Sequence, residues 1–423
     1  MKQILSVNKY INVYNVVEEI FVILCLFVMC SAGTAWGYGL RRGAIQWIFV
    51  VVCILIIRDR KFKIFPLGII YVIALLCNYF TSDYQNASSL YIVTVLQILS
   101  MSLLCIKREV WEKIFKYAYI WSLICSVSIM ISVISPSAFF SVFWPLNGPS
   151  PSQVGLFLQR GAAHQYSGFA FEIAEAAVMC NIGIGYKMSR YIIGEQFKLK
   201  DVFEILLLFG GLILTTKRTL FVIPFVILAV FILLQKTDLD KKIKLIFGGI
   251  IIVGLVLIIL LSVPQFGTIL ERFNDTDNID SMGGREYLWS LSSVLFLTSP
   301  IKGHGYNTFN IFAESVGLPT YYGHNSYLQL LGEGGLVGAI LILGCFYLAS
   351  LIYSIYMARK YNDDYMIWYC LYLQIMLALY SITGNVLSYY NQLFTWILAC
   401  IMVHNIGKQK RIEYEKSWNN DIS

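Results

Sequence analysis

Long runs of apolar residues, separated by short polar connections, extend over the whole chain. About 20 apolar residues form a helix that crosses a bilayer, and several runs carry aromatic residues at their ends, as is typical of the headgroup level. The pattern predicts an all-α, polytopic integral membrane protein: a single membrane domain over residues 1–423 with about twelve spans. The expected spans are 20–38, 43–57, 64–80, 90–106, 115–135, 166–186, 202–216, 219–234, 244–262, 325–357, 365–383 and 389–406.

Two of the connections are long. Residues 136–165 contain four prolines and several aromatic residues, which predicts an irregular loop because proline lacks a backbone N–H and disfavours regular structure. The larger connection, residues 263–324, joins the expected ninth and tenth helices. Leucines spaced for one helix face follow Arg285, so this loop is expected to include an amphipathic helix on the bilayer surface or over the cavity.

Lysine and arginine are distributed unevenly between the two sets of connections. With the N-terminus in the cytoplasm, 24 of the 32 lysine and arginine residues fall on the inner side. This agrees with the excess of positive charge on cytoplasmic loops. The chain is therefore expected to have both termini in the cytoplasm.

The run from Asp201 to Leu234 is interrupted by Lys217 and Arg218. The fifteen residues before the interruption would make a helix of only about 22 Å, against a hydrocarbon core of about 30 Å. Reading the run as one tilted helix would also move most later basic residues outside. Two short helices with an outward Lys-Arg turn are therefore predicted. Charges at that depth are expensive and typically functional, although a purely topological turn is the alternative.

Composition narrows the class further. The chain of 423 residues is 58% hydrophobic and only 13% charged, far from the roughly 25% charged residues of soluble proteins. The net charge of +7 is dispersed over short loops without a basic, aromatic stripe, so nucleic-acid binding is not expected. The ten cysteines lie in or beside apolar runs and show neither a disulfide framework nor a metal pattern.

The expected outer face collects Lys217, Arg218, Arg285 and His324. Guanidinium groups bind phosphate oxygens through paired hydrogen bonds, so two arginines could hold a diphosphate as a leaving group. A neutral His324 beside them could take a proton from an attacking hydroxyl. The alternatives are that Arg285 anchors its helix at the interface and that His324 caps the helix that follows.

Carboxylates within apolar runs need partners as well. Glu172 and Glu175 share one face of the sixth expected helix, and Glu333 lies in the tenth. The outer cations are candidate partners, with purely structural pairing as the alternative. Arg160 and His164, just before the sixth helix, could extend the same polar cluster.

Several of these segments together resemble the O-antigen polymerase and O-antigen ligase superfamily. The resemblance covers roughly residues 166–345. It rests on Leu214 to Thr219, on Gly284-Arg285 with Trp289, on Ser299 to Gly305, and on His324-Asn325-Ser326-Tyr327-Leu328-Gln329 followed by Glu333 to Gly338. Gly168-Phe169 and Glu172 also look like a family segment, although Ile173 stands where a proline often follows the glutamate.

The resemblance implies inverting glycosyl transfer at the outer face of a bacterial inner membrane, without metal or nucleotide cofactor. The donor would be an oligosaccharide on undecaprenyl diphosphate within the membrane lipid. Arg218, Arg285 and Lys217 would bind the diphosphate and His324 would be catalytic. The supporting residues would be Glu172, Arg160, Asn325 and Tyr327.

Three functions remain open at this point. The first is a polysaccharide polymerase that extends O-antigen of lipopolysaccharide or capsule repeat units, with a chain-length regulator as a candidate partner. The second is a ligase that transfers finished glycan to lipid A core. The third is a lipid-linked oligosaccharide flippase, for which related halves and a midplane site would be expected.

Overall fold

The computed structural model describes the chain outside several connections; the described residues are 2–31, 42–59, 64–80, 89–143, 151–170, 172–196, 198–236, 243, 247–251, 254–255, 258, 285–306, 308–318, 323–386 and 390–422. Within these residues all regular structure is helical, which confirms the all-α expectation.

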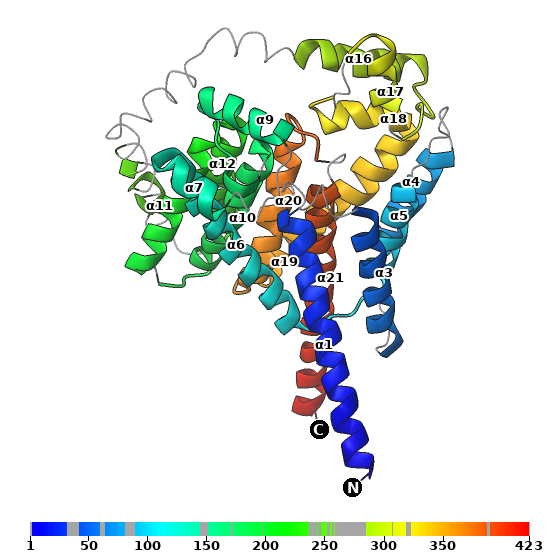
Figure 1. Ribbon diagram of the computed structural model, residues 1–423. Helices are drawn as coiled ribbons and strands as arrows, with labels where there is room; N and C mark the ends of the chain where they lie inside the picture. Colours follow the sequence, from blue (N-terminus) through cyan, green and yellow to red (C-terminus); the bar gives the residue numbers. More distant parts are fainter. Residues whose placement is uncertain are drawn as a thin grey trace.

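The helices follow the apolar runs closely (Figure 1). The first part of the chain forms α1 (Lys2–Ser31), α3 (Arg42–Asp59), α4 (Pro66–Phe80), α5 (Ser89–Ser102), α6 (Arg108–Ile134), α7 (Pro136–Val142) and α9 (Pro151–Ala162). The remainder forms α10 (Ile173–Ile192), α11 (Leu199–Leu214), α12 (Arg218–Leu234), α16 (Arg285–Thr298), α17 (Thr308–Ser315), α18 (Ser326–Ala339), α19 (Ala349–Lys360), α20 (Tyr365–Tyr380) and α21 (Tyr390–Ile422). A π-helix, Ile340–Leu348, joins α18 to α19.

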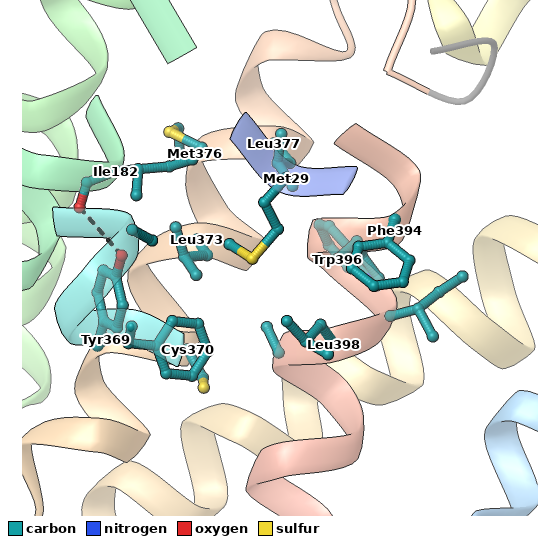
Figure 2. Close-up of a cluster of buried hydrophobic side chains, with 14 of the residues drawn as sticks. Met29, Ile182, Tyr369, Cys370, Leu373, Met376, Leu377, Phe394, Trp396 and Leu398 are labelled. Carbon is teal, nitrogen blue, oxygen red and sulfur yellow. Dashed lines mark hydrogen bonds between the residues drawn. The ribbon is translucent and has the colours of Figure 1, made fainter. Parts of the chain in front are cut away.

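The core is centred on α20, which is buried on nearly its whole circumference. A helix that is apolar all round belongs inside a bundle. Figure 2 shows α20 residues packed beside Met29 of α1 and the aromatic rings of Phe394 and Trp396 on α21. The hydroxyl of Tyr369 donates a hydrogen bond of 3.1 Å to the Ile182 carbonyl of α10. The Tyr369 hydroxyl therefore has a hydrogen-bond partner inside the core.

The outside of the bundle is also apolar. Ile23, Phe203 and Leu233 expose 63%, 67% and 81% of their surface, and similar side chains occur on most helices. Two described helical segments are long and apolar enough to cross a membrane, Arg108–Ile134 and Ser326–Lys360. An apolar surface of this extent fits a lipid environment. The count of twelve spans stays a prediction, because most of residues 237–284 lies outside the described part.

Two local expectations are wrong. The described part of the 136–165 connection is mostly helical and not irregular, because α7 begins at Pro136 and α9 begins at Pro151. Proline is well tolerated in the first turn of a helix, where the missing N–H would have had no intrahelical partner. The expected span 325–357 is not one regular helix either, because Gly335 has φ 58° and ψ −164° and divides α18.

The bundle has two distinct ends (Figure 1). Both chain termini lie at one end, here named the inner end, and α9, α16 and α17 lie at the other, here named the outer end. This arrangement agrees with termini on one side of a membrane. The expected amphipathic helix is present as α16, which buries Leu288, Leu291 and Leu295 along one face.

Candidate functional site at the outer end

The Lys-Arg turn joins two short helices, as expected. α11 ends at Leu214, Thr216 adopts a left-handed φ of 55°, and α12 begins at Arg218. The hydroxyl of Thr215 donates to the Leu212 carbonyl at 2.6 Å, which closes the end of α11. Lys217 and Arg218 are half-buried at this turn. Lys217 is therefore the N-cap residue of α12, and Arg218 is the first residue of that helix.

His324 lies two residues before the start of α18 in a left-handed conformation, φ 50°. Asn325 is the N-cap, and its side-chain oxygen accepts the backbone N–H groups of Tyr327 and Leu328 at 3.1 Å each. The capping role considered for His324 is thus filled by Asn325. A side chain held at positive φ costs about 1 kcal/mol or more, so other contacts must fix this backbone.

Those contacts come from the connection between α20 and α21, residues 381–386, here named the 381–386 loop. Its Asn385 Oδ1 accepts the His324 backbone N–H at 2.8 Å. The Ser381 carbonyl accepts the Ser326 N–H at 2.9 Å, and the Gly384 carbonyl accepts the Ser326 hydroxyl at 2.9 Å. The His324 motif is therefore held against this loop by backbone and side-chain bonds.

The same loop reaches the Lys-Arg turn. The hydroxyls of Thr383 and Thr219 are 3.2 Å apart, with Thr219 directly after Arg218 in α12. Thr383 and Asn385 are only two residues apart. The beginnings of α12 and α18 therefore meet on either side of the 381–386 loop.

Electrostatics place Arg285 and Lys217 near the imidazole of His324. Burial, together with the positive charges of Arg285 and Lys217, lowers the pKa of His324 from its ordinary value of 6.5 to about 4. Desolvation and like charge both disfavour the protonated ring. At neutral pH the ring is therefore uncharged, and cations from two separate segments act on it.

Glu172 and Arg160 pair with each other at this end, with 3.0 Å between Arg160 Nη2 and Glu172 Oε2. Glu172 is the N-cap residue of α10 but makes no side-chain cap bond. Tyr380, at the end of α20, lies within electrostatic reach of Glu172, Glu175 and Arg285. The Arg160–Glu172 pair thus borders the same region as Arg285.

The other two embedded carboxylates have structural contacts. Glu175 accepts the side-chain amide of Gln392 at 2.9 Å, which joins α10 to α21. Glu333 accepts the Phe309 N–H at 3.3 Å and the Gln329 amide at 3.1 Å. Glu333 therefore supports the start of α17, where a negative charge is favourable.

The glycine-rich segment after His324 folds against the Ser299–Gly305 segment. The Glu333 carbonyl accepts the Gly305 N–H at 2.7 Å, and the Pro300 carbonyl accepts the Leu336 N–H at 2.8 Å. A Cβ on Gly335 would lie 2.4 Å from the Gly303 nitrogen. Only glycine combines this positive φ with so close a backbone approach.

Sequence reasoning missed Thr383, Gly384 and Asn385. The available signal was a short polar stretch, Ser381 to Asn385, directly after the apolar run of α20. Its position at an outer connection could have raised it as a candidate. Its contact with His324 could not be deduced, because no local pattern pairs residues 61 positions apart.

The fold and this site together define an all-helical, membrane-embedded protein with cations and a neutral histidine assembled at one end of the bundle. Residues 203–343, a third of the chain, match the family model described as O-Antigen ligase. This part of the chain is therefore similar to the O-antigen ligase/polymerase superfamily, a class of glycosyltransferase-like enzymes. A search of curated proteins found no match.

Proposed function

We propose that this protein is a polysaccharide polymerase of the bacterial inner membrane. It would transfer a glycan from undecaprenyl diphosphate to a lipid-linked repeat unit at the outer face, with both chain termini in the cytoplasm. The observation that carries the proposal is the neutral His324 beside Arg285 and Lys217, with the start of α12 joined to the same loop.

Arg218 and Arg285 are proposed to bind the donor diphosphate. Each guanidinium can give two charge-assisted hydrogen bonds to phosphate oxygens, and Lys217 adds a further positive charge. α12 and α18 both begin at this region, so the positive ends of two helix dipoles favour an anion here. Such an arrangement stabilises the charge that develops on a departing diphosphate.

In the proposed reaction the acceptor hydroxyl oxygen bonds to the anomeric carbon with inversion while the bond to the diphosphate breaks. The diphosphate keeps the bonding electrons, and the hydroxyl loses its proton. His324 is the proposed catalytic residue, in contact with the reacting groups. The Arg160–Glu172 pair, Asn325 and Tyr327 support the site: Asn325 caps α18, and Tyr327 donates to the Ala378 carbonyl at 2.7 Å.

The lipid tail of the donor would run along apolar helix surfaces below Arg218. α12 exposes Val222 and Val226 there. An apolar cavity of about 200 Å³ lies among α10, α11, α12 and the residues Gly248, Gly249, Ile251 and Leu255. A polyprenyl chain is compatible with such surfaces because no polar group has to lose water.

A ligase that transfers glycan to lipid A core is the second candidate, favoured by the description of the matching family. Both activities use the same donor, so the cationic site suits either. A flippase is less well supported, because a midplane site would be expected for it, whereas α16, which begins at Arg285, lies at the outer end (Figure 1).

The test uses purified protein in liposomes with lipid-linked single repeat units. A polymerase produces a ladder of products, whereas a ligase transfers glycan only when lipid A core is supplied. His324→Ala should lower the rate by about 100-fold or more. His304→Ala is the control, because that imidazole contacts Thr298 on α16 at 2.8 Å and has no proposed role. If the wild-type protein neither extends the lipid-linked repeat units nor transfers glycan to lipid A core, the proposed function is wrong.

A further inference from the structure

The contact between His324 and Asn385 involves both the backbone and the side chain of the histidine. Asn385 Oδ1 accepts the backbone N–H of His324 at 2.8 Å, a short and well-formed bond. This bond fixes which way the amide points, because only the oxygen can accept. The Asn385 nitrogen then faces the imidazole, with 3.5 Å between Nδ2 and the ring atom Nδ1.

That orientation determines where the ring carries its proton. Asn385 Nδ2 bears only N–H groups, so a proton on Nδ1 would set two donors against each other. Nδ1 is therefore the bare, accepting nitrogen even though the contact is long. The ring is neutral at neutral pH, and a neutral imidazole carries one proton. That proton must be on Nε2.

We propose that Asn385 is a positioning residue that holds His324 in the Nε2–H tautomer, so that the imidazole acts as a hydrogen-bond donor and not as the base. This inference rests on the proposed function and deepens it. Nε2–H, Arg285 and Lys217 are then all donors, a set that fits the oxygens of a sugar diphosphate. The acceptor oxygen bonds to the anomeric carbon, the diphosphate leaves with the electrons, and the hydroxyl proton passes to water. His324 keeps its own proton throughout.

Nitrogen NMR of histidine-labelled protein in lipid bilayers tests the tautomer directly. The wild type at neutral pH should show His324 protonated at Nε2; the signal that disappears in His324→Gln assigns it, and the other three histidines serve as references. Asn385→Asp should move the proton to Nδ1, because a carboxylate accepts both the backbone N–H and Nδ1–H. Protonation of the wild type at Nδ1, or no change in Asn385→Asp, would overturn the assignment.

Substitutions of His324 test the donor role. A glutamine amide can place an N–H close to the Nε2 position, whereas asparagine reaches only towards Nδ1. We expect His324→Gln to keep about a tenth of the wild-type rate and both His324→Asn and His324→Ala to lose about 100-fold. Asparagine tolerates positive φ well, so strain would not explain inactivity of His324→Asn. Size-exclusion profiles in detergent verify that each variant is folded.

The outcomes distinguish a wrong donor role for His324 from a wrong proposed function for the protein. If His324→Gln is as inactive as His324→Ala while the wild type extends glycan, the donor role is wrong and the proposed function stands. If the wild type transfers no glycan, the proposed function is wrong, and the tautomer measured by NMR still decides the role of Asn385.

Discussion

The two ends of the bundle are both rich in cations but use them differently. At the inner end Lys187 contacts Asp201 and Glu204, which joins α10 to α11. Arg108 of α6 lies 2.7 Å from Asp364, which caps α20, and Lys410 of α21 also reaches this carboxylate. These cations are paired with carboxylates and hold helices together. At the outer end Arg160 also pairs with Glu172, but Arg285 and Lys217 in addition lower the pKa of a neutral imidazole, that of His324.

The scaffolds of the two ends differ as well. The outer end is held by backbone hydrogen bonds between loops, such as those from Gly305 to Glu333 and from Ser326 to Ser381. It also concentrates left-handed backbone at residues other than glycine, namely His164, Thr216 and His324. Strained backbone that persists in a structure is often found at functional sites. Charge alone therefore does not mark the site; the surroundings of each charge do.

The largest effect is expected from a substitution that disrupts the close contact between Gly335 and Gly303 at the outer end. Gly335→Ala places a Cβ 2.4 Å from the Gly303 nitrogen at a φ of 58°, so we expect a loss of about 3 kcal/mol or more in stability. Gly338→Ala is the matched control, since a Cβ there meets no atom within 4 Å. Thermal unfolding in detergent measures both. Equal midpoints would show that the close approach of these two segments is not needed.

The next largest difference is expected between arginine-to-lysine substitutions at the two ends, measured as the rate of glycan extension. Arg285→Lys removes the paired guanidinium N–H donors that suit a diphosphate. We expect about 100-fold slower glycan extension, equivalent to about 2.7 kcal/mol in activation free energy. The matched inner variant is Arg190→Lys, whose guanidinium lies 2.7 Å from Glu195, and it should change the rate less than about threefold. Similar losses in both variants would remove the distinction between the ends.

A substitution in the ion pairs of the inner end should lower the free energy of unfolding and leave the rate of glycan extension unchanged. Lys187→Met leaves the half-buried carboxylates of Asp201 and Glu204 without this partner, which we expect to cost about 2 kcal/mol. The rate per folded molecule should stay near the wild-type value. A rate loss that exceeds the loss of folded protein would contradict the structural role assigned to Lys187.

The smallest effect concerns pH. The folded pKa of His324, about 4, lies below its ordinary value of 6.5, so the unfolded chain binds a proton first as the pH falls. Stability is therefore full above about pH 6.5 and declines towards pH 4, by about 1 kcal/mol after allowance for solvent screening. His324→Gln should remove this part of the decline relative to wild type. Identical pH profiles would argue against a neutral ring beside Arg285 and Lys217.

The sequence by itself determined the helical elements and the chemical types at the outer end. The short apolar runs around Lys217 and Arg218 predicted two helices, and α11 and α12 confirm them. The leucine spacing predicted α16. These features are encoded by neighbouring residues, through periodicity and the cost of placing charge in hydrocarbon.

Which of these groups meet depends on how the helices pack. The tertiary structure placed Thr383 beside Thr219, 164 positions away, and Asn385 beside His324, and it turned the proline-rich 136–165 connection into α7 and α9. The partners of a polar side chain depend on how distant helices pack, and packing is a property of the whole core. The arginines and the histidine could therefore be identified from the sequence, whereas the position of Asn385 beside His324 is known only from the fold.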